Sequence, residues 1–273
     1  MTLASDGCYY LDGGALFGVV PKSLWERKAP PDARNRIRVG TNCLVVRDGG
    51  RTIVIETGIG DKLEAKLAAL HGVDRDRVLP DALLAAGIDP QKVDLVVNTH
   101  LHFDHCGWNT RRVDGRLVPT FPKARYFVQR GEWEHAHTRL DRDRVSYRDE
   151  NYDPLVESGQ MTLLEGNTTV APGVSVEVHS GHTRNMQVVL VASGGRTCAY
   201  LSDLFPTIHH LKPTWLLAFD LFPLESIESK KKLLARAAKE KWLCIFTHDH
   251  EHPWGYIRQD GEDYRFEPAV PTE

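Results

Sequence analysis

A dense run of potential metal ligands is the feature that most restricts how this chain can fold. Residues 100–105 contain three histidines and one aspartate, and they follow an apolar segment at 93–97 that only Asp94 interrupts. Imidazole nitrogen and carboxylate oxygen are ligands that Zn²⁺ and related ions accept readily. Core packing gives no reason to place four such groups side by side. We therefore expect a strand that ends at a metal site, and a fold that brings further ligands to it.

Size and charge exclude several other classes of protein. The chain has 273 residues, of which 41% are hydrophobic and 26% charged, so a packed globular core is expected. The net charge of −3 and the pI near 6.5 lack the basic excess of a nucleic-acid binder. No apolar run approaches the roughly 20 residues that span a bilayer. We expect neither nucleic acid nor membrane as a partner.

The N-terminal residues and the cysteines predict a cytoplasmic location. Residues 1–6 lack the basic and apolar regions of a secretory signal. The five cysteines are dispersed, without a CxxC pair, at Cys8, Cys43, Cys106, Cys198 and Cys244. An odd, scattered set fits reduced thiols better than a disulfide framework.

Apolar patterning and turn residues predict strands and helices in the first half of the chain. We expect strands at 37–46, 51–55, 94–98 and 126–128. We expect helices at 61–72, where Leu63, Leu67 and Leu70 share one face, and at 80–86 and 131–138. Residues 1–36 are expected to form an N-terminal arm packed by Trp25. Residues 139–160 are expected to form an exposed, polar excursion.

The second half repeats the pattern of strands followed by a helix. We expect strands at 162–164, 174–179, 188–191, 198–201 and 242–246, and a last hairpin at Asp260-Gly261. Ser226 is expected to cap a helix at 227–241 whose inner face carries Leu233, Leu234, Ala237 and Ala238. Lys230, Lys231 and Lys232 would then lie on its solvated face. This alternation predicts an α/β protein whose sheets are covered by helices on their outer faces.

The spacing of the ligands indicates more than one metal ion. In extended backbone, residues two apart point the same way, so His100 and His102 can reach one ion. Asp104 and His105 must point in another direction. These six residues can therefore serve two adjacent ions.

With this cluster the sequence resembles the metallo-β-lactamase superfamily, and the resemblance covers most of the chain. The family's later ligands have matches in Gly181-His182-Thr183, Tyr200-Leu201-Ser202-Asp203 and Phe246-Thr247-His248. The resemblance implies that His182 is a ligand, that Asp203 bridges two ions, and that His248 is the last histidine. His250 and His252 are rivals of His248, and His179 is expected to be structural.

The resemblance also implies a complete ligand set and a fold. Metal one would be held by His100, His102 and His182, metal two by Asp104, His105 and His248, and Asp203 would contact both. Asp104 and Asp203 are the expected catalytic carboxylates. We expect two divalent ions, zinc first, with manganese or iron as alternatives. The implied fold is a four-layer αβ/βα sandwich, with residues 1–273 as a single domain and residues 1–36 packed on it.

Such a site predicts hydrolysis. Two cations about 3.5–4 Å apart hold a water and lower its pKa from near 16 toward neutrality. The resulting hydroxide attacks a carbonyl or phosphorus, while one ion stabilises the developing charge. The ligands must be deprotonated, so activity is expected to fall in acid.

The sequence departs from the family pattern at two places. Glu56 stands where the family often has an aspartate that orients a ligand, and its longer side chain has a different reach. Lactonases of the superfamily often carry a tyrosine soon after the bridging aspartate, but here Leu204, Phe205 and Pro206 follow. The proton donor must come from elsewhere. His209 and His210 are the candidates, with exposed loop histidines as the alternative.

The resemblance is to the branch that contains quorum-quenching lactonases and organophosphate hydrolases. Asn35-Arg36-Ile37, Asp203–Thr207 and Pro213–Trp215 carry this part of the resemblance. It implies a small-molecule substrate: a lactone, ester or phosphotriester. The residues that we expect to line the substrate pocket are Trp25, Trp108, Phe205, His209 and His210, with core packing as the alternative for the aromatic residues.

Other functions on the same fold stay open. A hydroxyacylglutathione-type thioester hydrolase shares all seven ligands, although we find no convincing C-terminal set of basic residues for glutathione. An iron-dependent, oxygen-using enzyme is an alternative from another class. A binding protein with vestigial metals is a third reading, which the intact ligand set disfavours. The sequence does not decide whether the chain forms a homodimer.

Overall fold

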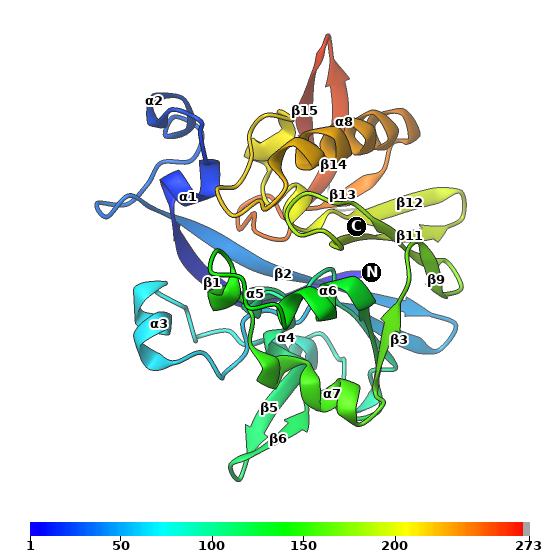
Figure 1. Ribbon diagram of the computed structural model, residues 1–273. Coiled ribbons are helices and arrows are strands. Elements are labelled where there is room, and N and C mark those ends of the chain that lie inside the picture. The colour runs from blue at the N-terminus through cyan, green and yellow to red at the C-terminus, as the bar shows by residue number, and fades with distance from the viewer. Residues whose placement is uncertain (270–273) are drawn as a thin grey trace. The chain divides into compact units, whose positions relative to one another are not determined.

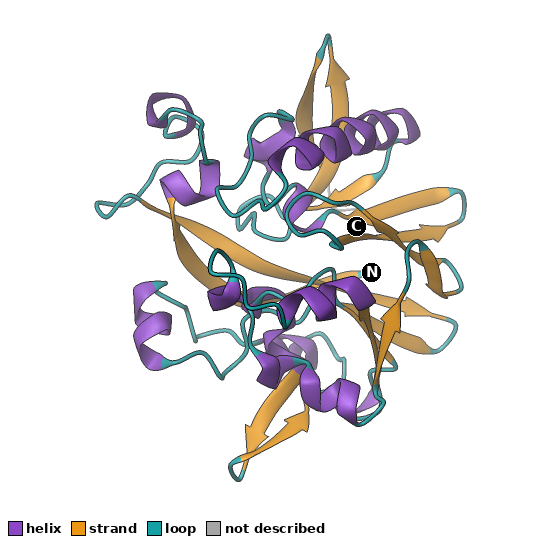
Figure 2. Cartoon of the chain, in the orientation of Figure 1, coloured by secondary structure: helices purple, strands orange, loops and turns teal. Residues whose placement is uncertain are grey.

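The computed structural model describes residues 1–269 and contains two compact units, in which strands and helices alternate (Figures 1 and 2). The first unit comprises Met1–Tyr9 and Gly40–Gly166, and the second comprises Tyr10–Val39 and the chain from Asn167 onward. The prediction of a single domain over residues 1–273 stays a prediction, and its last four residues lie outside the described part.

A six-stranded sheet forms the centre of the first unit. Its order is β1-β2-β3-β4-β7-β8, and β3, β4, β7 and β8 are parallel. The strands are β1 (Thr2–Asp12), β2 (Arg36–Asp48), β3 (Arg51–Ile55), β4 (Leu95–Val97), β7 (Arg125–Gln129) and β8 (Met161–Leu164). The strands predicted in this half are confirmed. The apolar runs of β4 and β7 are typical of parallel strands that are buried on both faces, and β2 pairs with β3 antiparallel.

Short helices and one hairpin complete the first unit. The helices are α3 (Ala65–Leu70), α4 (Leu79–Ala85), α5 (Phe103–Cys106), α6 (Arg130–Ala136) and α7 (Asp153–Glu157), with 3₁₀ turns η1 (Pro90–Lys92), η2 (Gly107–Asn109), η3 (Arg144–Ser146) and η4 (Asp149–Asn151). The hairpin pairs β5 (Thr110–Val113) with β6 (Arg116–Pro119). The core gathers Val54, Val96, Leu83 and Tyr126.

Three expectations for the first 160 residues need correction. Residues 139–160 are not an exposed excursion, since Tyr147, Tyr152 and Leu155 are buried in the core of the first unit. The apolar face predicted for α3 is not buried, and Leu70 is 56% exposed. Residues 1–36 are more than an arm, because β1 is a strand of the six-stranded sheet. The composition of residues 139–160 and the periodicity of the leucines in α3 were thus poor guides to the burial of single side chains.

A seven-stranded sheet with order β15-β14-β13-β12-β11-β10-β9 forms the second unit. The strands are β9 (Thr168–Ala171), β10 (Val174–Val178), β11 (Gln187–Ser193), β12 (Arg196–Tyr200), β13 (Leu243–Ile245), β14 (Trp254–Asp260) and β15 (Asp263–Pro268). The helical segments are α1 (Gly13–Phe17), α2 (Lys22–Trp25), η5 (Ser202–Leu204), η6 (Ile208–Leu211) and α8 (Pro223–Glu240). Only β12 and β13 run parallel among these pairs, and α8 is the crossover that parallel strands require (Figure 1).

Helix α8 differs from its prediction in where it begins and in the burial of Lys230. It begins at Pro223, because proline suits the first helical turn, and Ser226 lies inside it instead of capping it. Leu233, Leu234 and Ala237 are buried as predicted. Lys230 is only 1% exposed, so its predicted solvated position is wrong. It precedes Leu233 and Leu234 by three and four residues and therefore shares their face.

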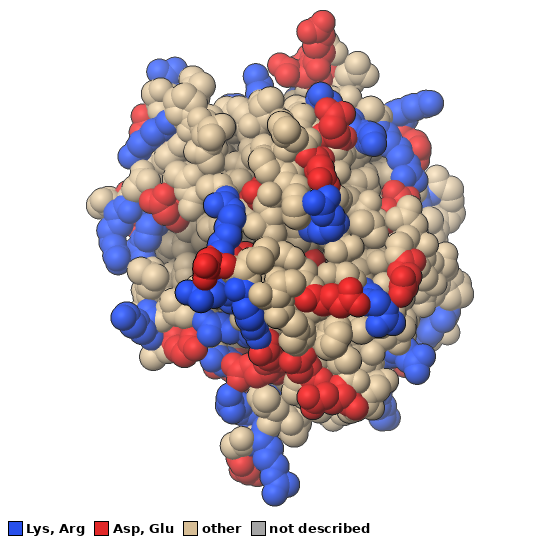
Figure 3. Space-filling model, in the orientation of Figure 1, with Lys and Arg blue, Asp and Glu red and all other residues tan. Residues whose placement is uncertain are grey.

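Within residues 1–269 no helix combines the length and apolar character needed to cross a membrane. Basic and acidic side chains are interspersed on the face drawn in Figure 3. All five cysteines are free thiols. The predicted cytoplasmic location stays a prediction.

Candidate metal centre

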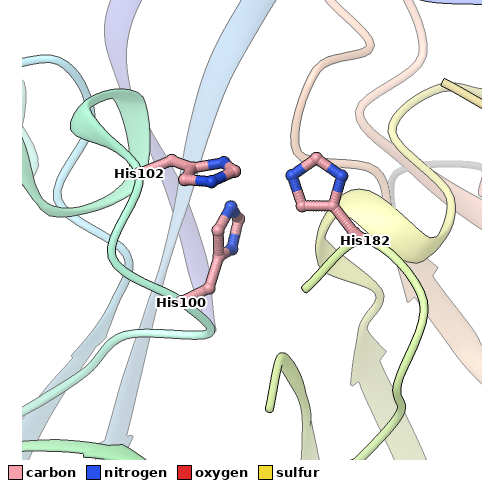
Figure 4. A group of neighbouring side chains, drawn as sticks. All are labelled: His100, His102 and His182. Carbon is pink, nitrogen blue, oxygen red and sulfur yellow. The ribbon is translucent and has the colours of Figure 1, made fainter. Parts of the chain in front are cut away.

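The first group of ligands lies where β4 ends. His100 and His105 are fully buried, and His102 and Asp104 are 7% and 9% exposed. The ring centroid of His100 lies 4.6 Å from that of His102 and 4.0 Å from that of His105. Figure 4 shows the rings of His100 and His102 side by side, both projecting from one loop. The two rings thus lie next to each other, and their binding of one ion stays a prediction.

The backbone of this loop is held by a neighbouring loop at 56–60. Thr57 N donates to His105 O at 2.8 Å, and Gly107 N donates to Gly58 O at 2.7 Å. A Cβ added at Gly107 would lie 2.0 Å from the carbonyl atoms of Ile59, so the approach requires glycine. A side-chain amide of Asn98 also donates to His105 O at 3.2 Å. Hydrogen bonds to its backbone therefore hold the ligand loop in place without an ion.

Oxygen atoms lie behind two of these histidines. Glu56 Oε2 lies 3.6 Å from His105 Nδ1, and Glu56 Oε1 accepts a bond from Thr99 N at 2.6 Å. Thr99 Oγ1 lies 3.0 Å from His100 Nδ1. Burial raises the pKa of Glu56. An oxygen placed beside Nδ1 favours a ring orientation in which Nε2 faces away from it and toward the ligand group. Glu56 therefore lies beside His105, and whether it replaces the usual aspartate stays a prediction.

Tyr9 contacts a ligand that the sequence analysis did not connect with it. Its hydroxyl donates to Asp104 Oδ2 at 2.5 Å, and its side chain is 1% exposed. Tyr9 lies on β1, in the segment that was expected to be an arm. Tyr9 is 95 residues from Asp104, so no local pattern in the sequence could have joined them.

The second group of ligands is confined to the second unit. His182 follows β10, Asp203 lies in η5 after β12, and His248 follows β13; each is at most 7% exposed. His182 Nε2 lies 3.3 Å from Asp203 Oδ2, and His248 Nε2 lies 3.1 Å from Asp203 Oδ1. Each oxygen of Asp203 therefore faces a different histidine.

A carboxylate also lies behind His182. Asp220 Oδ1 is 3.0 Å from His182 Nδ1, and Asp220 is 6% exposed. Sequence reasoning missed Asp220, which is 38 residues away along the chain. Figure 4 includes the His182 ring.

The other histidines considered as ligands lie elsewhere. His179 is half-buried, and its Nε2 lies 3.7 Å from Glu177 Oε2 on the preceding strand. His250 is exposed at its loop and lies beside Glu251, 3.8 Å away. Of the candidates near the end of β13, His248 is the one grouped with a buried carboxylate.

Most side chains expected to line a substrate pocket are buried. Trp25 and His210 stack on either side of the Phe17 ring, at centroid distances of 5.3 and 5.0 Å. The ring nitrogens of His210 bond to Thr207 Oγ1 and to Leu16 O, and burial lowers its pKa to about 3. Phe205 is fully buried as well.

Trp108 and His209 are the other two side chains that were expected to line the pocket. In the first unit, Trp108 Nε1 donates to Asp6 Oδ1 at 2.6 Å. His209 is half-buried, and burial lowers its pKa. Of the five, His209 is the side chain left with the most exposure, and the pocket role of the set stays a prediction.

The structure places a small pocket beside the first ligand group. It is lined by Ile59, Lys62, Leu63, Phe103, Arg148, Glu150 and Asn151. Phe103 lies between His102 and Asp104 in the sequence, so the pocket adjoins the ligand loop. Its lining combines apolar, basic, acidic and amide side chains.

The donor set defines a class of protein. Buried imidazoles and carboxylates, placed at strand ends and supported from behind by oxygen atoms, are compatible with metal binding. The sequence profile of the metallo-beta-lactamase superfamily matches residues 36–248. The chain belongs to this superfamily, which confirms the predicted α/β fold class and the metallo-β-lactamase fold.

Several known proteins are similar to this chain in sequence or in structure. An N-acyl homoserine lactonase, AttM of Rhizobium johnstonii, is 39% identical over 211 residues, which cover 70% of this chain and 71% of the relative. A probable metal-dependent hydrolase from Staphylococcus aureus has a TM-score of 0.89 at 28% identity, covering 99% of this chain and 97% of its own. AidC, a dizinc quorum-quenching lactonase solved with a product, has a TM-score of 0.80 at 18% identity, covering 99% and 94%.

Proposed function

We propose that this chain is a metal-dependent hydrolase that binds two divalent ions. The ligands would be His100, His102, Asp104 and His105 from the first unit, and His182, Asp203 and His248 from the second. The observation that carries the proposal is Asp203, whose oxygens face His182 and His248 at 3.3 and 3.1 Å. A carboxylate in that arrangement suits a bridge between two ions.

The chemistry of the donors supports zinc first. Five imidazoles and two carboxylates form a nitrogen-rich set, which zinc accepts, and manganese and iron are alternatives. The carboxylates behind His105 and His182 are typical of histidines that bind metals. The description of AidC as a dizinc enzyme supports the same choice.

Bound at these residues, the ions would supply Lewis acidity and a nucleophilic hydroxide at neutral pH. The chain's own residues would position both. Asp104 and Asp203 are the proposed catalytic carboxylates. The Tyr9 hydroxyl donates to Asp104 Oδ2 and would orient that carboxylate. The five histidines must be neutral to act as ligands, so acid would oppose metal binding and activity.

We propose N-acyl homoserine lactones as the substrate class. The curated relatives are named as N-acyl homoserine lactonases, and a solved neighbour carries a product of that type. Other esters and phosphotriesters belong in the same test. The substrate is the partner we propose, and a homodimer stays an open prediction.

The test combines metal analysis with a substrate panel. Protein loaded with zinc, manganese or iron would be assayed on homoserine lactones of several acyl lengths, aryl esters and phosphotriesters. We expect two ions per chain and lactone ring opening that chelation abolishes. Asp203→Ala should lose metal and turnover while keeping a folded circular-dichroism spectrum. Asp263→Ala is the control, because Asp263 is a surface residue paired with Lys212. Full metal content and rate in Asp203→Ala would refute the assignment.

A further inference from the structure

Asp220 is a buried carboxylate that has no assigned part in the reaction. Its Oδ1 lies 3.0 Å from His182 Nδ1, and its Oδ2 accepts a bond from Ser226 Oγ at 3.1 Å. Both residues are nearly fully buried, with 6% and 1% exposure. We propose that Asp220 is the positioning residue for His182 and that Ser226 in turn positions Asp220. This inference rests on the proposed function, in which His182 is a metal ligand.

The geometry of the three groups gives the reason. A carboxylate at Nδ1 favours the tautomer that carries its hydrogen on Nδ1, which leaves the lone pair on Nε2. His182 Nε2 is the atom that lies 3.3 Å from Asp203 Oδ2. Asp220 therefore selects both the ligand atom of His182 and the direction in which the ring points.

The backbone holds the same residues in register. Leu221 N donates to His182 O at 3.1 Å, and Phe222 N donates to Gly181 O at 2.9 Å. These two bonds pair the segment that carries His182 with the segment that carries Asp220. The position of the carboxylate behind the imidazole is thus built into the fold, and does not depend on one flexible side chain.

Gly181 explains how α8 comes close enough for Ser226 to take part. A Cβ added at Gly181 would lie 2.2 Å from Ser226 Oγ and 2.6 Å from Ser226 Cα. Only glycine permits this approach. The glycine of the Gly-His pair therefore serves the contact between the ligand loop and the first turn of α8.

A comparable arrangement in the first unit supports the reading. Glu56 lies behind His105 Nδ1 and accepts a bond from Thr99 N, as Asp220 lies behind His182 Nδ1 and accepts from Ser226. Each unit thus places one buried carboxylate behind one histidine and fixes that carboxylate with a second donor. A purely structural acid would not need to meet an imidazole in both units.

The experiment uses the full chain and the variants Asp220→Asn, Asp220→Ala and Ser226→Ala. The control is Glu225→Gln, because Glu225 lies next to Ser226 but contacts Ser180 and Arg184. Zinc affinity would be measured by competition with a chromophoric chelator. The tautomer of His182 would be read from ¹⁵N shifts of metal-free protein, a signal that a merely structural role would not move. Unfolding midpoints report folding separately.

We expect Asp220→Ala to weaken the binding of one zinc ion by about 10- to 100-fold and to change the His182 tautomer. Asp220→Asn keeps the volume and should show an intermediate loss. Ser226→Ala should show a smaller loss of about threefold to tenfold, and Glu225→Gln none. If Asp220→Ala does not fold, the other two variants still decide the question.

Two failures can be told apart. Wild-type protein that binds two zinc ions, together with Asp220 and Ser226 variants of unchanged affinity and tautomer, would overturn the positioning role and leave the proposed function intact. Wild-type protein that binds no zinc would overturn both.

Discussion

The burial of Lys230 leads to a prediction about stability and pH. Its Nζ donates to Trp215 O at 2.6 Å and lies 5.1 Å from the centroid of the Phe205 ring. Burial lowers the pKa of Lys230 from its ordinary 10.5 to about 7, and the nearby Asp220 only partly opposes this. His210, itself buried and neutral, is the other titratable group that faces it. The folded protein therefore holds Lys230 uncharged above neutral pH.

The sign and size follow from linkage. The unfolded chain keeps a lysine that titrates near 10.5, so from pH 7 upward it binds more protons at this residue than the folded chain does. Stability must then rise with pH in this window. Relative to a lysine with an unshifted pKa, Lys230 lowers the free energy of unfolding by about 5 kcal/mol at pH 6, where it is buried with its charge, and by about 2 kcal/mol at pH 9, where it is held deprotonated. The contribution of Lys230 to the free energy of unfolding should rise by about 2.5 kcal/mol between these pH values.

Urea denaturation of metal-free protein at pH 6, 7, 8 and 9 would measure this, on wild type, Lys230→Met and Lys231→Met. Lys231 is the matched control, because it is 57% exposed and pairs with Glu228. Lys230→Met removes the donor to Trp215 O, which costs about 1–3 kcal/mol at every pH, so the slope is the diagnostic quantity. A difference between wild type and Lys230→Met that stays flat from pH 6 to pH 9 would refute the reasoning.

Three further predictions concern the ligand groups. Tyr9→Phe removes the donor to Asp104 and should weaken zinc binding several-fold in a chelator competition, whereas equal affinity would show that the bond is incidental. Glu56→Gln should weaken zinc binding at least about tenfold by removing the carboxylate behind His105, with the apo unfolding midpoint as the check on folding. Gly181→Ala should lower both zinc affinity and the unfolding midpoint, because its Cβ would meet Ser226; an unchanged midpoint would count against the tight approach.

The local sequence predicted the structure well where the metal ligands directly follow a strand. The ligands at 100–105 follow an apolar strand, and residues two apart in extended backbone must meet, so His100 and His102 could be paired from spacing alone. The family resemblance extended this to the distant residues Asp203 and His248. The strands were predictable for the same reason, since turn residues bound each apolar run.

What spacing could not provide is the set of groups behind the ligands. Tyr9 is 95 residues from Asp104, and Asp220 is 38 residues from His182, so no local pattern joins them. Lys230 is a different kind of miss. A run of three lysines looks like a solvated face, but helical periodicity places Lys230 on the stripe of Leu233 and Leu234. The periodicity thus indicated that Lys230 is buried, whereas the composition of the lysine run indicated the opposite.

The buried face of α8 serves two purposes that compete: the stability of the fold and the positioning of the loop that carries His182. Leu233, Leu234 and Ala237 pack on the sheet of the second unit, while Ser226 and Lys230 on the same stripe donate to Asp220 and to Trp215 O. Apolar residues at those two positions would remove the cost of a buried amine and would leave the 215–222 segment without two of its bonds. That segment carries Asp220, so a more stable helix should hold the His182 ring less firmly. The stability of Lys230→Met relative to wild type should then be greater at pH 6 than at pH 9. The same variant should bind zinc more weakly than wild type. If zinc affinity does not change, Lys230 supports only the fold, and the bond from Ser226 to Asp220 does not depend on it.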